Sequence, residues 1–332
     1  MRHIILLFLI IFSSCNNSEN LVLIKNSGKA QGTFFHIQYL SKNAQDYSFE
    51  IDSIFLKIDS SLSIYKDYSL ISLLNNGKMI KMDSLFKKVF HMSRDVYNET
   101  NGNFDCTIYP LVKEWGFYNF SFTDYLVIDS LKIDKLLDNI GFSKVDFKGD
   151  SLKLIDKMQL DFNAIAQGYT VDIIGEFLQK KGCTDFLIEV GGELLAKGRN
   201  ADGEIWSIGV DKPTDTINYS DRFQFILNLD EKAIATSGSY RKFFTINQIK
   251  YSHTISPFTG FPCSNRLLSV SVIHSSCALA DAYATAFMVM GVKKIKEFII
   301  NKPEIEVYLV YTDKNNNWKT YVSPNLKNRI RN

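Results

Sequence analysis

The stretch from 186 to 192, Phe-Leu-Ile-Glu-Val-Gly-Gly, decides between two classes of fold for this chain of 332 residues. It reads as a short apolar strand that ends in paired glycines, and three more strand-like runs follow at 206–210, 223–229 and 267–273. A doubly wound fold would place a helix between successive strands, whereas several of these runs are close enough to form hairpins. The sequence therefore predicts an α+β fold with mostly antiparallel or mixed sheets.

Apolar residues at helical spacing surround these strands. They predict helices over 51–62, 85–100, 131–140, 168–181, 277–290 and 293–300. Two further strand-like runs predict an early strand at 33–40 and a late one at 306–311. Gly141, Gly182 and Gly291 follow three of the helices and are typical stop signals. Without a repeat or a Pro/Ser-rich linker, we expect one large domain over 27–332, with helices flanking the sheets.

Composition excludes several classes of protein. With 45% hydrophobic and 22% charged residues, the chain is not expected to be disordered. Its 38 Lys and Arg against 36 Asp and Glu give a net charge of +2, so nucleic acid is not an expected partner. Four cysteines lack CxxC or zinc spacing and are expected to be scattered buried thiols rather than disulfides: Cys106, Cys183, Cys263 and Cys277.

The N-terminus has the pattern of an export signal. A basic start precedes an apolar run over 4–12, which is too short to span a bilayer, and then Ser13, Ser14 and Cys15. This resembles a bacterial lipobox and predicts a signal peptide over 1–14, lipidation of Cys15 and a polar tether over 15–26. The expected location is a membrane-anchored lipoprotein facing the periplasm, on the inner membrane. Plain cleavage, or a retained anchor, remains the alternative.

Asp281 and Thr285 stand four residues apart in an alanine-rich predicted helix, so their oxygen atoms share one face. Carboxylate and hydroxyl oxygens are ligands that Mg²⁺ accepts together with water and phosphate oxygens. A carboxylate in such an apolar helix is costly to bury unless it is paired or metal-bound. A helix-end or surface aspartate is the alternative interpretation.

Three other segments have two interpretations each. His253 lies in a turn-rich stretch and is either a proton acceptor or a structural histidine. Asp105 follows a helix end and could bind a nucleotide or cap a turn. The segment 161–169 leads into a helix whose N-terminus would suit a pyrophosphate, although each of these signals is ambiguous alone. The common GxGxxG, GxxxxGK[ST], HExxH and GxSxG motifs do not occur.

Eight segments in order resemble the ApbE family, the FAD:protein FMN transferases, and the lipoprotein-like start is also typical of that family. The resemblance runs from about Gly32 to Gly291. The matching segments are Gly32-Thr33, Ser63 to Tyr65, Gly102 to Asp105 with Trp115 to Phe117, Asp161 to Asp172, Gly191 to Glu193, Thr236 to Gly238, His253 to Pro262, and Ala280 to Thr285.

The resemblance implies a T-fold-like domain that takes FAD as substrate, transfers FMN to a Thr or Ser hydroxyl of an acceptor protein and releases AMP. A respiratory redox-complex subunit is the implied acceptor. Mg²⁺ would be held by Asp281, Thr285 and the Ala166 carbonyl, while His253 and Asp281 would be the catalytic residues. The positions implied to line the FAD site are Gln31, Tyr65, Asn103, Phe104, Asp105, Asn163, Tyr169 and Ile255.

Some residues depart from the family pattern. Gln31 stands where many relatives have Met, Gln167 where many have Lys, Ser256 where Asp is usual, and Phe258 where Arg is frequent. These changes leave the rate and the acceptor preference open. A lipoprotein that binds FAD without transferring it, and a pyrophosphatase that gives FMN and AMP, are the alternative functions.

Overall fold

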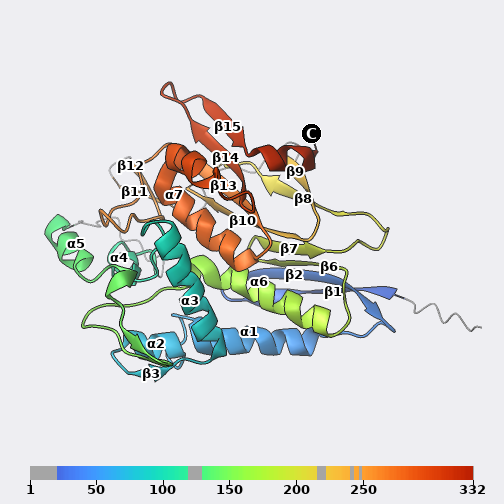
Figure 1. Cartoon of the computed structure of the whole chain (residues 1–332), viewed down its shortest axis with the longest axis horizontal. Helices are drawn as coiled ribbons and strands as arrows, with labels where there is room; N and C mark the ends of the chain where they lie inside the picture. Colours follow the sequence, from blue (N-terminus) through green and yellow to red (C-terminus); the bar gives the residue numbers. More distant parts are fainter. Residues whose placement is uncertain (1–20, 119–128, 215–221, 240–242, 247–248, 332) are drawn as a thin grey trace, which may run out of the picture.

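The computed structural model describes residues 21–118, 129–214, 222–239, 243–246 and 249–331 (Figure 1). Its centre is an eight-stranded sheet in the order β1-β2-β6-β7-β10-β13-β14-β15, in which every neighbouring pair is antiparallel. The strands are β1 (Leu21–Ala30), β2 (Thr33–Lys42), β6 (Phe186–Val190), β7 (Glu193–Lys197), β10 (Lys232–Gly238), β13 (Leu267–His274), β14 (Glu306–Thr312) and β15 (Trp318–Val322). The predicted α+β class with antiparallel strands is confirmed.

Helices pack on one face of this sheet. They are α1 (Ser48–Leu62), α3 (Ser84–Glu99), α6 (Asn163–Lys180) and α7 (Cys277–Ile299). α6 packs on β6 and β7, while α7 lies against β10 and β13 (Figure 1). Buried apolar side chains of α1 and α6 meet those of β2 and β6 in one core cluster, and α3 and α7 meet β13 in another. The hydrophobic effect of this burial stabilises the layer.

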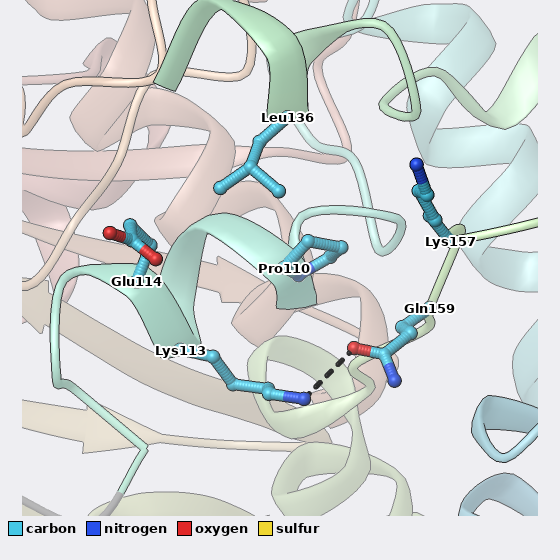
Figure 2. A pocket seen from close by; sticks show the side chains of 6 residues that line it. All are labelled: Pro110, Lys113, Glu114, Leu136, Lys157 and Gln159. Carbon is cyan, nitrogen blue, oxygen red and sulfur yellow. Dashed lines mark hydrogen bonds between the residues drawn. The ribbon is translucent and has the colours of Figure 1, made fainter. Parts of the chain in front are cut away.

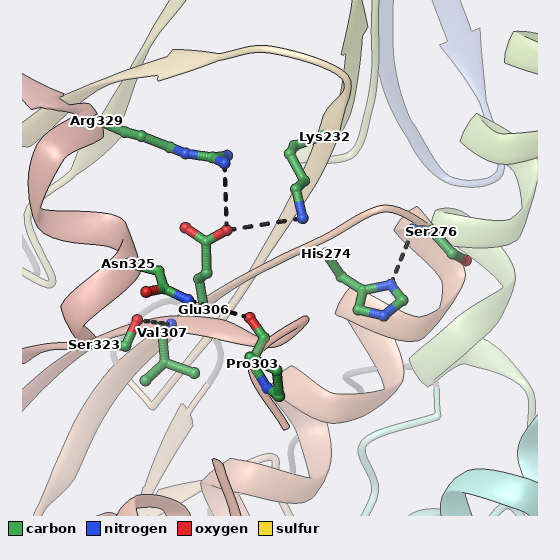
Figure 3. Close-up of polar contacts among 9 residues, drawn as sticks. All are labelled: Lys232, His274, Ser276, Pro303, Glu306, Val307, Ser323, Asn325 and Arg329. Carbon is green, nitrogen blue, oxygen red and sulfur yellow. Dashed lines mark hydrogen bonds and ion pairs between the residues drawn. The ribbon is translucent and has the colours of Figure 1, made fainter. Parts of the chain in front are cut away.

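The opposite face of the sheet carries a smaller layer. Strands β8 (Trp206–Asp211), β9 (Phe223–Leu229) and β16 (Ile330–Arg331) form a three-stranded sheet, and the short helix η3 (Pro324–Arg329) joins it. Phe225, Leu227 and Tyr308 belong to the core between the layers. The buried carboxylate of Glu306 faces Lys232 at 3.8 Å and Arg329 at 3.6 Å (Figure 3), which ties η3 to the large sheet.

Short elements complete the fold beyond the ends of α3 and α6. They are α2 (Leu70–Asn75), β3 (Ile80–Lys81), α4 (Tyr109–Glu114), α5 (Ser130–Leu137), η1 (Phe142–Lys144), β4 (Phe147–Lys148), β5 (Ser151–Leu152), β11 (Phe243–Ile246) and β12 (Ile249–Ser252). Strands β3, β5 and β4 form a small sheet, and β11 pairs with β12. Leu111, Trp115 and Ile133 form a separate apolar cluster between α4 and α5.

Two elements differ from the sequence-based boundaries. α6 begins at Asn163, five residues before the predicted start at 168, because Gly168 lies inside the helix at a close contact with α7. α7, by contrast, agrees with the two helices predicted over 277–290 and 293–300, because Gly291, with a φ of 73°, is not helical and separates two helical parts. Strand β1 begins at Leu21, so residues 21–26 of the expected tether belong to the sheet, where ten residue pairs join β1 to β2.

Other expectations concern the cysteines and the N-terminus. Cys106, Cys183 and Cys277 are buried free thiols and Cys263 is a partly buried one, as predicted. None of the helices in the described ranges has the length and apolar character needed to cross a membrane. The expected signal peptide over 1–14 and the lipidation site Cys15 lie outside the described residues.

Candidate functional site

The candidate site is centred where α6 crosses α7. The backbone N–H of Gly168 on α6 donates to the Asp281 carboxylate on α7 at 3.2 Å. A Cβ at Gly168 would lie 2.4 Å from the backbone oxygen of Cys277, so only glycine permits this approach. Thr285 is half-buried one helical turn beyond Asp281. Asp281 and Thr285 therefore lie on one helix, as predicted, and the crossing brings α6 next to Asp281.

Asp172 on α6 fixes the start of α7. Its carboxylate accepts hydrogen bonds from the Ser276 hydroxyl at 2.7 Å, the Cys277 N–H at 2.8 Å and the Ala278 N–H at 3.0 Å. The Ser276 N–H in turn donates to Nδ1 of His274 at 2.9 Å (Figure 3). An anionic carboxylate at a helix N-terminus also interacts favourably with the helix dipole. Asp172 lay within the matched sequence, but nothing in the sequence alone revealed this role.

Gln31 reaches the same part of α6 from a tight turn. Gln31 and Gly32 connect β1 to β2 and both have positive φ, 51° and 73°, as a two-residue hairpin turn requires. The Gln31 amide hydrogen-bonds to the Thr170 hydroxyl, which also donates to the Ala166 carbonyl at 2.8 Å. The hairpin thus places Gln31 beside the carbonyl predicted as a metal ligand.

Tyr65 and Asn163 form a second group at the N-terminus of α6. The Asn163 amide donates to the Tyr65 hydroxyl at 3.3 Å, and the Tyr65 ring stacks on Tyr118 with centroids 5.2 Å apart. Tyr65 remains 55% exposed, which leaves an aromatic surface available beside the helix end. Stacked aromatic rings of this kind can receive a flat heterocycle, and the helix N-terminus favours an anion.

The segment 103–105 lies next to that helix end, because the Asp161 N–H donates to the Cys106 carbonyl at 2.7 Å. Asn103 and Asp105 are both buried. Asp105 accepts hydrogen bonds from the Thr107 N–H and hydroxyl at 2.8 and 2.7 Å, and from the Phe142 N–H at 3.3 Å. Both of its oxygens therefore accept hydrogen bonds from the chain around this turn, and its role toward FAD stays a prediction.

His253 stands on a loop that Trp115 anchors. The indole N–H of Trp115 donates to the Gly260 carbonyl at 2.7 Å, and the His253 ring packs edge-on against Phe117 with centroids 6.4 Å apart. Ser256 accepts hydrogen bonds from the Phe258 and Thr259 N–H groups, as an aspartate in a turn would. The departure at Ser256 thus preserves the turn while removing a charge.

The predicted site residues divide into four groups. The first lies at the crossing of α6 and α7, and the second lies around the start of α6; they are Gln31, Ala166, Asp281 and Thr285, and Tyr65, Asn103, Asp105 and Asn163. His253 belongs to the neighbouring loop, whose Phe258 ring lies against Gly102. The remaining predicted positions are buried in the apolar core: Phe104, Tyr169 and Ile255.

Burial shifts the protonation of two carboxyl groups in the site. It raises the pKa of Asp281 to about 7, and within the described residues the Gly168 N–H is the sole hydrogen-bond donor to that carboxylate. Burial also raises the pKa of Asp161 to about 6, although the Asn163 N–H at 2.7 Å opposes the shift. A buried carboxylate with so little compensation is a suitable ligand for a cation.

A surface pocket of about 470 Å³ lies away from these groups (Figure 2). It is lined by Pro110, Lys113, Glu114, Leu136, Lys157 and Gln159. Lys113 donates to the Gln159 side chain at 3.2 Å. None of the predicted site residues lines it, so the pocket is separate from the candidate site.

This fold and this site define the class of the flavin transferases. A flavin transferase ApbE from Vibrio cholerae has the same fold with a TM-score of 0.83 at 29% identity, covering 93% of this chain and 100% of the other. The flavinyl transferase ApbE of Pseudomonas stutzeri gives 0.81 at 28% identity, covering 92% and 95%.

The chain belongs to the ApbE family, whose model matches residues 31–309. Among its relatives, an FAD:protein FMN transferase of Vibrio cholerae is 31% identical over 291 residues, 85% of each protein. One from Escherichia coli is 28% identical over 310 residues, 90% of this chain and 87% of the relative. The predicted family is therefore confirmed, and the match includes both α6 and α7.

Proposed function

We propose that this enzyme transfers FMN from FAD to a Thr or Ser hydroxyl of an acceptor protein and releases AMP. The observation that carries the proposal is the crossing of α6 and α7, where Asp281, Thr285 and the Ala166 carbonyl bring hard oxygen donors together beside a helix N-terminus. Curated relatives that align with most of the chain are named FAD:protein FMN transferases. Membership of that family and this donor set support the same reaction.

The residues present fit Mg²⁺. Asp281 is a buried carboxylate with one hydrogen-bond donor among the described residues, and Thr285 and Ala166 would add a hydroxyl and a carbonyl oxygen. The Thr170 hydroxyl now donates to the Ala166 carbonyl, but it can turn toward Gln31, its other partner. When bound, the metal would neutralise charge on the diphosphate and polarise it for phosphoryl transfer.

The chain's own residues would then bind and orient the dinucleotide. Tyr65 offers an aromatic face and Asn163 an amide at the start of α6, and the helix N-terminus is favourable to diphosphate oxygens. The acceptor oxygen forms a bond to the FMN phosphorus while the bond from that phosphorus to the bridging oxygen breaks, so AMP leaves with that oxygen. His253 would take the proton of the acceptor hydroxyl.

The proposed cellular location and the proposed acceptor protein rest on the expected N-terminal lipidation signal and on the family. Lipidation of Cys15 would hold the domain at the periplasmic face of the inner membrane, where membrane-bound redox complexes expose their subunits. We propose such a subunit as the acceptor, because protein flavinylation equips it for electron transfer. The chain offers no comparable argument for a nucleic-acid partner, since its net charge is +2.

The test combines the full chain, FAD, Mg²⁺ and a candidate acceptor domain from a respiratory redox complex, and measures acceptor mass and free AMP. Transfer predicts equal amounts of AMP and of an acceptor that has gained FMN. AMP without the mass gain would identify the pyrophosphatase alternative, and bound FAD with neither product would identify the storage alternative. Asp281→Ala should abolish AMP release while partly sparing FAD binding.

A further inference from the structure

A second cavity, of about 470 Å³, opens on the sheet face opposite the helices. Its floor is the outer face of the large sheet, where His36 on β2 and Glu189 on β6 are direct cross-strand partners. Its wall is β8 in the smaller sheet. The lining residues are Thr33, Phe34, His36, Glu189, Gly191, Gly192, Leu194, Ile208, Gly209, Val210, Asp211, Arg222, Ile234 and Thr236, and we call this cavity the β8 groove.

β8 presents its edge to the groove. The four consecutive residues from 208 to 211 all line the cavity, whereas one face of a strand would contribute only every second residue. Within the described part of the chain β8 is the last strand of its sheet and pairs only with β9. The backbone groups of such an edge can form hydrogen bonds with another extended chain.

Glycines keep the groove accessible to a second backbone. Gly191 and Gly192 lie in its lining, and no described atom lies within 4 Å of the position that a Cβ at Gly192 would take, whereas the Phe223 ring fills that space at Gly209, at 2.4 Å. Glycine in or beside a strand often marks such a close backbone approach. Phe34, 59% exposed, adds apolar surface on β2.

The groove continues into the candidate site. A Cβ at Gly191 would lie 2.8 Å from the amide nitrogen of Gln167, so the paired glycines border the second turn of α6. On the neighbouring strand, Thr33 follows the turn that carries Gln31. An occupant of the groove would therefore reach residues adjacent to the Ala166 carbonyl and Asp281.

The charged side chains of the groove already have partners. Arg222 and Asp211 form a two-pronged ion pair at 2.7 and 3.1 Å, and Glu189 accepts the Gly192 N–H at 2.8 Å. A charged ligand would have to compete with these contacts, whereas an uncharged backbone would not. The groove is thus suited to an uncharged extended segment.

We propose that the β8 groove binds the acceptor protein through an uncharged extended segment, which pairs with the edge of β8 and carries its Thr or Ser hydroxyl over Gly191 and Gly192 to the start of α6. This deepens the proposed function and rests on it. The edge of β8 would supply affinity through backbone hydrogen bonds. The narrow glycine rim would admit the hydroxyl-bearing residue to the diphosphate.

The test replaces His36, an exposed residue of the groove floor, by tryptophan. His36→Trp should fill the groove and raise the KM for the acceptor at least tenfold, with the KM for FAD unchanged. The matched control is Lys25→Trp, an exposed position on the same face of the sheet but outside the lining. The acceptors are the candidate acceptor domain and an acetylated decapeptide library with one fixed threonine, and thermal unfolding checks that both variants are folded.

Each outcome separates the two proposals. If the wild type modifies neither acceptor, the proposed function itself fails. If it modifies the domain but no peptide, binding of an extended segment is wrong. Equal acceptor KM values for His36→Trp and Lys25→Trp would overturn the groove as the docking site. A parallel rise in the KM for FAD would also overturn it, because the groove would then belong to the FAD site.

Discussion

The carboxylate of Asp172 on α6 accepts a hydrogen bond at 2.7 Å from the hydroxyl of Ser276, the residue that caps α7. The same carboxylate accepts hydrogen bonds from two backbone N–H groups in the first turn of α7. α7 carries Asp281 and α6 carries Ala166, so this contact sets the relative position of the two proposed metal-binding elements. Ser276 lies five residues before Asp281 on α7, and Asp172 lies six residues after Ala166 on α6.

We expect Asp172→Asn to lower both stability and metal-dependent activity. The variant keeps one acceptor oxygen, but its amide nitrogen cannot accept the hydrogen bonds that reach the other carboxylate oxygen, so about 2–4 kcal/mol of unfolding free energy should be lost. AMP release should require more Mg²⁺. Glu176→Gln is the control, one turn further along α6 and exposed. If the control and Asp172→Asn unfold at the same temperature, Asp172 does not hold α7.

Gly168→Ala should separate α6 from α7. The added Cβ would lie 2.4 Å from the Cys277 backbone oxygen, so the helices must shift and the hydrogen bond to Asp281 should lengthen. Overpacking of this kind costs about 1–3 kcal/mol. In Gly175→Ala on the same helix the Cβ would meet side chains rather than backbone, the end of Leu195 at 2.8 Å and the Phe186 ring at 3.5 Å, and it should cost less. Thermal unfolding and the Mg²⁺ dependence of AMP release measure the two effects.

Much of the fold could be predicted from local sequence. The apolar run over 186–190 and those at 206–210, 223–229 and 267–273 became strands, because period-two patterns and nearby turns act over a few residues. The start of α6 was misplaced because Gly168 discourages a helix locally while the contact with α7 favours it. The tether expected up to residue 26 overlooks the apolar run over 21–24, which opens β1 and is itself a strand signal.

The site was predictable in part. The spacing of Asp281 and Thr285 predicts two oxygen-bearing side chains on one helix, and both lie on α7. The roles of Asp172 and Gly168 arise from contacts more than a hundred residues apart in sequence, which no local pattern reveals. Asp105 matches a position of the family's FAD site, and the structure adds that both of its carboxylate oxygens accept hydrogen bonds within the protein.

Asp161→Asn should stabilise the protein above pH 6. Burial raises the pKa of Asp161 from 3.8 to about 6, so its favourable protonated form is lost as pH rises through 6, and the charged form then weakens the fold by about 3 kcal/mol. Asparagine keeps the hydrogen bond from the Asn163 N–H and avoids that charge. The gain in unfolding temperature should be full at pH 8 and vanish below pH 3.8. The exposed Asp156→Asn should show no such pH-dependent gain.

Asp281→Asn should raise the unfolding temperature of the metal-free protein, because a neutral amide replaces a buried carboxylate while the bond from Gly168 is kept. The wild type should gain about 2.7 kcal/mol at an Mg²⁺ concentration of one hundred times Kd. The variant should gain nothing from Mg²⁺. Thr285→Val should weaken the response to Mg²⁺ without the higher starting stability. A full Mg²⁺ response in Asp281→Asn would contradict the metal site.

Trp115→Phe tests whether the anchored loop positions His253. The variant keeps an aromatic ring but loses the hydrogen bond to the Gly260 carbonyl, which should cost about 1–3 kcal/mol of stability. If the loop sets the distance from His253 to the acceptor hydroxyl, kcat for FMN transfer should fall about tenfold while the KM for FAD stays unchanged.

Trp206→Phe is the matched control for that variant. The Trp206 indole N–H on β8 donates to the Lys197 carbonyl at the end of β7 at 3.0 Å, so its loss should lower stability by a similar amount. Because Trp206 belongs to the core cluster between the two sheets, whereas Trp115 belongs to the cluster that contains Ile255, kcat should remain at the wild-type value. Equal kcat values for the two variants would show that lost stability alone explains the effect, and that Trp115 does not position the histidine.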